Sequence, residues 1–151
     1  MLMLEISNLE KYYGDRLILS IKDFKAYRGD KIGIVGMNGA GKTTLLNIIS
    51  KKCEVDEGML KTYGSISYIT QLEEAEDSEI NESIAKEFGV ESLKIDTASG
   101  GERTKYKIAC CISRKSDILL ADEPTSNLDI EGIEILQEKL IQHEGLLLIV
   151  S

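Results

Sequence analysis

One glycine-rich segment limits, more than any other, what this chain of 151 residues can fold into. Residues 36–43, GMNGAGKT, match the pattern G-x-x-x-x-G-K-[S/T], and an apolar stretch at 31–35 comes directly before them. The glycines let the backbone curl so that successive N–H groups point at one anion, and a helix that begins at Lys42 adds the positive end of its dipole. The segment therefore predicts a phosphate-binding loop between a strand and a helix.

The side chains around the last glycine have different expected roles in binding Mg²⁺-ATP. Lys42 brings a positive charge to the β- and γ-phosphates, the hydroxyl of Thr43 is a ligand for Mg²⁺, and Thr44 donates on the α-phosphate side. A chance match in a glycine-rich turn is the alternative, and the flanking strand and helix make it the weaker one. The residues of this loop expected to contact ATP are Gly36, Asn38, Gly39, Ala40, Gly41, Lys42, Thr43 and Thr44.

A pair of carboxylates follows the apolar strand expected at 118–121. Asp122 and Glu123 come directly after it, at the sheet edge where ligands bind in parallel α/β folds. One carboxylate on the metal leaves its neighbour free to orient water, so we expect Asp122 on the Mg²⁺ side and Glu123 as the general base. An acidic turn without function is the alternative, and a nearby phosphate loop makes it weaker.

Hydrophobic periodicity predicts an α/β fold in one domain over residues 1–151. An antiparallel beginning makes the N-terminal β structure mixed, and strands that alternate with helices in the second half favour a parallel core sheet covered by helices. Strands are expected at 3–9, 16–24, 31–35, 58–61, 65–70, 118–121 and 146–150, and helices at 42–50, 80–88, 99–113 and 130–141.

Composition argues against several other classes of protein. The chain carries 26 acidic and 18 basic residues, a net charge of −8, and a protein that grips nucleic acid alone should show a basic face. No apolar run approaches the roughly 18 residues that span a bilayer. The three cysteines form no metal or disulfide pattern and suit a reducing compartment. These features favour a cytoplasmic protein with no direct DNA contact.

Taken together, the motifs resemble those of the ATP-binding cassette (ABC) ATPases, over nearly the whole chain. The family's signature motif opens a helix and faces the γ-phosphate bound by another cassette. Ser is also an ordinary helix cap, and a Glu three residues later completes a capping box. Ala98 replaces the family's leading Leu, a departure that leaves the anion-binding turn intact. The residues that look like this motif are Ser99, Gly100, Gly101 and Glu102.

Three further positions follow the order of the family's motifs. Gln71 matches the glutamine loop, which in the family reaches the metal and the attacking water. Residues 126–129, SNLD, match the loop through which paired cassettes contact each other. Tyr13, just ahead of Gly14, stands where the family stacks an aromatic ring on adenine. Tyr12 is the competing choice, because alternation along a strand turns only one of the two toward the base.

The short segment between Gln71 and Ser99 resembles the ABC-F subfamily, in particular the N-terminal cassette of its antibiotic-resistance members. The resemblance implies a soluble protein of two cassettes that acts on the ribosome, and SGGERTKYKIACCIS is most similar to the branch that protects ribosomes from antibiotics. A longer helical arm would be expected of a nucleotide-binding subunit that docks on a membrane partner. That transporter subunit is one alternative, and a non-catalytic nucleotide-binding fragment is the other.

The resemblance also implies that the cassette is incomplete at its C-terminal end. In the family, a switch histidine would come directly after Ser151. His143 is expected near a helix end, where it is exposed or stabilises the helix dipole. We expect two cassettes to close on Mg²⁺-ATP, with the signature turn of one covering the nucleotide of the other. For the 151-residue chain we expect nucleotide binding with weak or absent turnover.

Overall fold

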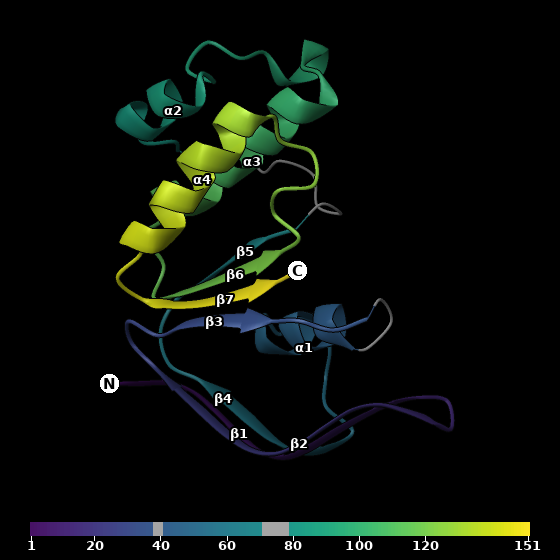
Figure 1. Ribbon diagram of the computed structural model, residues 1–151. Coiled ribbons are helices and arrows are strands. Elements are labelled where there is room, and N and C mark those ends of the chain that lie inside the picture. The colour runs from purple at the N-terminus through teal and green to yellow at the C-terminus, as the bar shows by residue number, and fades with distance from the viewer. Residues whose placement is uncertain (38–40, 71–78) are drawn as a thin grey trace.

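The computed structural model describes residues 1–37, 41–70 and 79–151, and these form two sheets with helices on both sides of the second (Figure 1). The elements are β1 (Leu2–Tyr13), β2 (Arg16–Tyr27), β3 (Lys31–Ile34), α1 (Lys42–Ile49), β4 (Glu57–Thr62), β5 (Ile66–Ile69), α2 (Glu82–Phe88), a 3₁₀ turn (Ile95–Thr97), α3 (Gly100–Ser113), β6 (Ile118–Asp122), α4 (Ile130–Gln142) and β7 (Leu146–Val150).

The first sheet is antiparallel, with strand order β2-β1-β4. Its strands are longer than the sequence predicted, because the turn between β1 and β2 takes up only Gly14 and Asp15, and Gly14 has the positive φ of 60° that such a turn needs. Leu4, Ile6 and Leu9 of β1 are fully buried and turn one face of this sheet toward the core.

The second sheet is parallel throughout, with strand order β3-β7-β6-β5. The predicted α/β class with an N-terminal β subdomain and a parallel core sheet is confirmed. Residues 118–121 of β6 are all buried, as expected of a central strand covered on both faces. Because the four strands run the same way, their C-terminal ends lie at one edge of the sheet.

Two hydrophobic cores use the two faces of this parallel sheet. On one face, α1 lies between the parallel and antiparallel sheets, and Leu46 and Ile49 pack with alternate strand residues such as Leu120 and Leu148 (Figure 1). On the other face, α2, α3 and α4 cover the intervening strand residues. Both cores end at the strand termini, so the loops beyond them are held on a rigid support.

The segment before α3 forms a short helical arm, as predicted. Asn81 caps α2, with its side chain accepting hydrogen bonds from the backbone N–H groups of Ser83 and Ile84, and Gly89 ends the helix in a left-handed conformation with φ 69°. None of the helices in the described part of the chain is both long and apolar enough to cross a bilayer.

The expectation for His143 is wrong. It follows α4 at the helix C-cap, but its side chain is half-buried rather than exposed, and its Nε2 is buried with no hydrogen-bond partner among the residues described. Burial lowers the pKa of His143, and the nearby charges of Lys31 and Arg28 lower it further. The imidazole is therefore neutral at pH 7 and does not act as a cation at the helix dipole.

This histidine gives the chain a specific pH dependence, since it is the only one present. Below about pH 6.5 the unfolded chain takes up a proton at His143, whereas the folded chain resists it. The free energy of unfolding should therefore decrease as the pH falls from about 7.5 through 6.5 toward the lower folded-state pKa. Urea unfolding at stepwise pH should show a smaller decrease for His143→Gln. Parallel pH profiles for the two proteins would contradict the assignment.

Candidate functional site

The C-terminal edge of the parallel sheet brings the phosphate loop and the acidic strand end together. The Thr43 hydroxyl, in the first turn of α1, donates a hydrogen bond of 2.8 Å to Oδ2 of Asp122 at the end of β6. A hydroxyl and a carboxylate side by side are the oxygen ligands that Mg²⁺ prefers. The residues present thus fit a magnesium ion, at the position where the sequence predicted one.

The turn into α1 depends on a glycine. Gly41 is the N-cap of α1 with φ 82°, and a Cβ atom at this position would lie 2.8 Å from the backbone oxygen of Ile18. Both the left-handed conformation and the close approach of β2 exclude a larger residue. The predicted contact residues Asn38, Gly39 and Ala40 lie outside the described residues.

Lys42 lies at the mouth of the loop. Its Nζ donates to the carbonyl of Gly36 at 2.6 Å and to that of Ser151 at 3.0 Å. Both acceptors are backbone oxygens just beyond the ends of β3 and β7, so the ammonium group is held at the sheet edge. A phosphate there would offer a stronger, charged acceptor for the same group.

Strand alternation brings Tyr13, and not Tyr12, to the phosphate loop. The Tyr13 hydroxyl is 3.4 Å from the Thr44 hydroxyl, and the ring is 55% exposed. Tyr12 is held elsewhere, because its hydroxyl donates to Glu10 at 2.7 Å and its backbone N–H donates to Asp56 at 2.6 Å. The geometry therefore favours Tyr13 of the two alternatives as the residue facing a base.

Glu123 has an unusual backbone conformation. Its φ is 42°, in the left-handed region, and its N–H donates to the carbonyl of Val150 at 2.9 Å. A non-glycine residue in this region is strained, and such strain persists where the surroundings fix the conformation, often at functional sites. The hydrogen bond to β7 is one such constraint, and it leaves the side chain exposed beyond Asp122.

Tyr68 is a neighbour of Asp122 that the sequence analysis missed. It lies on β5, beside β6, and is 9% exposed. Burial raises the pKa of Tyr68, and the Asp122 carboxylate raises it further, so the phenol stays protonated. The available signal was a tyrosine within the short strand that leads to Gln71. Gln71 itself lies outside the described residues.

The signature turn opens α3 as predicted, and its capping box is present. The Ser99 side chain accepts from the Glu102 N–H at 3.2 Å, and the Glu102 carboxylate accepts from the Ser99 N–H at 3.1 Å. Gly100 follows the cap and is exposed. A Cβ atom on Gly101 would lie 3.4 Å from the Asn127 carbonyl, so this turn packs against the 126–129 loop.

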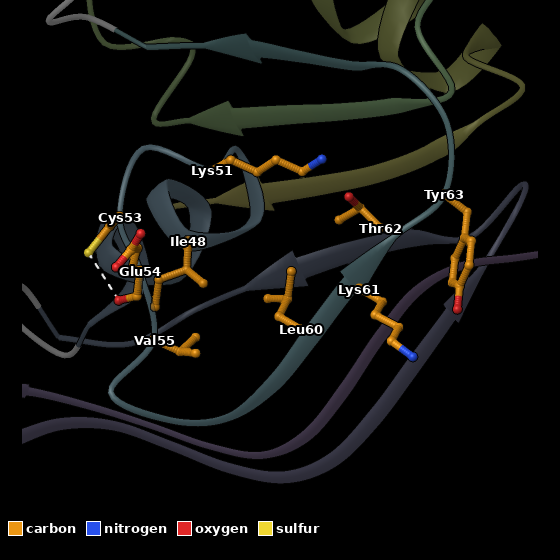
Figure 2. Close-up of a pocket in the computed structure, with 9 residues that line it drawn as sticks. All are labelled: Ile48, Lys51, Cys53, Glu54, Val55, Leu60, Lys61, Thr62 and Tyr63. Atoms are coloured by element: carbon orange, nitrogen blue, oxygen red, sulfur yellow. Dashed lines mark hydrogen bonds between the residues drawn. The ribbon is translucent and has the colours of Figure 1, made fainter.

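A wide cavity of about 720 Å³ lies away from these residues, between the end of α1 and β4 (Figure 2). Ile48, Val55 and Leu60 form its apolar wall, and Lys51 and Lys61 stand at its sides. None of the predicted site residues is in its described lining. The predicted site residues described by the structure therefore lie outside this cavity.

Comparison with known proteins finds relatives over most of the chain. The sequence profile of the ABC transporter family matches residues 19–126. The erythromycin resistance ATP-binding protein MsrA of Staphylococcus epidermidis is 42% identical over 136 residues, covering 88% of this chain and 28% of MsrA. The ribosome protection protein VmlR of Bacillus subtilis is 36% identical (98% of this chain, 31% of VmlR). The energy-dependent translational throttle protein EttA of Escherichia coli K12 is 32% identical (99% and 32%).

Solved structures show the same fold at lower identity. The ATP-binding subunit of an ABC transporter superposes with a TM-score of 0.85 at 22% identity, covering 99% of this chain and 79% of that one. An ABC transporter in an inward-facing conformation gives 0.78 at 23% identity, covering 99% and 73%. The chain spans about three tenths of the length of the curated relatives.

The strain at Glu123 leads to a stability prediction. Glycine adopts a left-handed φ without a steric penalty, so Glu123→Gly should be more stable than Glu123→Ala by about 1 kcal/mol. Both variants lose the carboxylate, so urea unfolding compares the backbone alone. At exposed Glu134 within α4 the order should reverse, because glycine destabilises a helix by about 1 kcal/mol relative to alanine. Equal stability of the two Glu123 variants would refute the strain.

Proposed function

The chain belongs to the ABC transporter family, with ABC-F proteins among its relatives. We propose that it is an ABC-F cassette, which binds Mg²⁺-ATP at the edge of its parallel sheet. The observation that carries the proposal is the 2.8 Å contact between Thr43 and Asp122. It joins the phosphate loop to the acidic end of β6, which are far apart in the sequence.

Each residue at the sheet edge has a task in holding the triphosphate. The Lys42 ammonium exchanges the carbonyls of Gly36 and Ser151 for the β- and γ-phosphate oxygens. Thr43 and Asp122, together with Gln71, would hold Mg²⁺. When bound, the ion offsets the charge on the phosphate oxygens. The N-terminus of α1 favours negative charge at the same point.

The other end of the nucleotide lies toward β1. The exposed ring of Tyr13 offers a flat apolar face for adenine, and its hydroxyl stands beside Thr44 at the start of α1. The distance from Tyr13 to the loop is thus set by the packing of β1 against α1, which are both part of the first core.

Hydrolysis requires a second cassette in this proposal. The turn at 99–102 is exposed and lies at the helical arm, so it can cover the nucleotide held by a partner cassette. Glu123 acts as the general base that orients water for in-line attack, and its fixed backbone keeps the carboxylate next to Asp122. The chain alone therefore binds ATP with little turnover, and pairing completes the site.

The names of the relatives support a role at the ribosome for the whole protein, and we propose the cytoplasm as its location. MsrA is named for erythromycin resistance, VmlR for ribosome protection and EttA for control of translation. The short arm between β5 and α3 is consistent with this branch of the family. The ribosome and a second cassette are thus the proposed partners.

Removal of the loop lysine tests nucleotide binding directly. Lys42→Ala should weaken the affinity for fluorescent Mg²⁺-ATP by about tenfold or more, because a charged contact to phosphate is lost. Lys25→Ala is the matched control, since Lys25 pairs with Glu5 on the antiparallel sheet and is exposed. If the affinity of Lys42→Ala equals that of wild type, the phosphate loop is wrongly assigned.

The two tyrosines give a second test, directed at the base. Tyr13→Ala should weaken ATP binding by about tenfold through lost stacking, and leave the binding of inorganic triphosphate unchanged. Tyr12→Ala should alter neither, and Tyr13→Phe should behave as wild type. Calorimetric titration of each variant with both ligands makes the comparison. A loss of ATP affinity in Tyr12→Ala alone would assign the base to the other face of β1.

A further inference from the structure

An ion pair joins the signature helix to the loop that follows the acidic strand end. Lys105, in the second turn of α3, has its Nζ 3.0 Å from Oδ2 of Asp129, the last residue of the 126–129 loop. The Lys105 side chain is only 21% exposed, although Asp129 is 61% exposed. The lysine is thus packed between α3 and α4 before it reaches its partner.

Asp129 holds two elements at once. While Oδ2 pairs with Lys105, Oδ1 accepts the N–H of Gly132 at 2.8 Å and caps α4. The N–H of Gly132 and then the charge of Lys105 lower the pKa of Asp129, so the carboxylate is ionised at neutral pH. The start of α4 and the second turn of α3 therefore share one charged residue.

The Lys105 side chain passes close to a glycine. A Cβ atom on Gly132 would lie 2.9 Å from Oδ1 of Asp129, 3.1 Å from Cε of Lys105 and 3.4 Å from Cδ2 of Leu128. A larger residue would require the lysine stem and the carboxylate to shift. The absence of a side chain at Gly132 thus leaves room for the ion pair at the first turn of α4.

A second contact lies at the beginning of α3. A Cβ atom placed on Gly101 would lie 3.4 Å from the Asn127 carbonyl, an ordinary van der Waals distance, so the turn and the loop come within a methyl group of each other there. One helical turn on, the ion pair of Lys105 and Asp129 joins the same two segments. Close approach at one point and an ion pair at another restrict the orientation of the signature turn relative to the 126–129 loop.

We propose that Lys105 is a positioning residue, which through Asp129 fixes the signature turn relative to the 126–129 loop so that a second cassette meets both as one rigid surface. The inference rests on the proposed pairing of cassettes. Lys105 touches no nucleotide in its own chain. Its effect is to keep the exposed Ser99 and Gly100 at a constant distance from the loop, and small misplacements of positioning groups are costly.

The matched variants come from two ion pairs of similar geometry. Lys105→Met removes the proposed clamp, and Asp129→Asn removes its charge while keeping a good helix cap. Lys139→Met removes a different ion pair, in which Lys139 of α4 lies 2.8 Å from Glu87 of α2. The Lys139 side chain is 15% exposed, and this pair lies away from the 126–129 loop. Lys105→Arg preserves the charge and serves as the conservative rescue.

The experiment measures ATP-dependent self-association of the chain by sedimentation in a Glu123→Gln background, together with ATP affinity at concentrations too low for pairing. Lys105→Met and Asp129→Asn should each weaken self-association by about fivefold to tenfold, and the double variant no more than either alone. Lys139→Met and Lys105→Arg should stay within about twofold of the background, and ATP affinity should stay constant. Equal association of Lys105→Met and Lys139→Met overturns the proposal.

Amide hydrogen exchange distinguishes failure of this inference from failure of the proposed function. If ATP binds but no self-association occurs, the pairing is refuted, and the clamp is judged by exchange alone. Faster exchange at Gly101 and Glu102 in Lys105→Met and Asp129→Asn, and not in Lys139→Met, supports it. Unchanged exchange at the signature turn overturns it. Loss of ATP binding in the unaltered chain would instead refute the phosphate site.

Discussion

The hydrogen bond between Thr43 and Asp122 is the contact on which the functional part of this molecule depends. It forms only because β3 and β6 run in the same direction, with β7 between them, so that the loop after β3 and the end of β6 reach the same edge. The flanking hydrophobic cores hold the two residues of this hydrogen bond in place. Helix α1, which begins at the loop, is packed on both sides by sheets and cannot shift without disturbing either.

The same edge combines backbone strain, a hydrogen-bonded ammonium group and a buried phenol. Glu123 is left-handed, Lys42 is held by two carbonyls, and the phenol of Tyr68 is buried beside the Asp122 carboxylate. The left-handed backbone of Glu123 and the burial of the Tyr68 phenol each cost free energy. These three residues lie at the C-terminal end of the parallel sheet, opposite the end where His143 lies. Their position agrees with a site that receives a charged ligand.

In the proposed function, the helical side of the molecule contributes surface for a second cassette rather than contacts to the nucleotide of its own chain. The capping box at Ser99 and Glu102 makes the signature turn rigid within α3, and Asp129 makes the loop rigid within α4. Lys105 connects the two. Local capping and one longer-range ion pair thus give a surface with defined geometry, which is what a composite site between two cassettes requires.

The sequence by itself determined the classes of element, the phosphate loop, the acidic strand end and the family, because each rests on local pattern: glycines at fixed spacing, apolar periodicity, a serine with a glutamate three residues on. Tertiary structure alone decided the rest. Strand pairing turned Tyr13 rather than Tyr12 toward Thr44, extended β1 to Tyr13, and placed Tyr68 beside Asp122. Packing buried His143 and passed Lys105 over Gly132 to Asp129. These are contacts between residues distant in the chain, and no local pattern specifies which side chains meet once the elements pack.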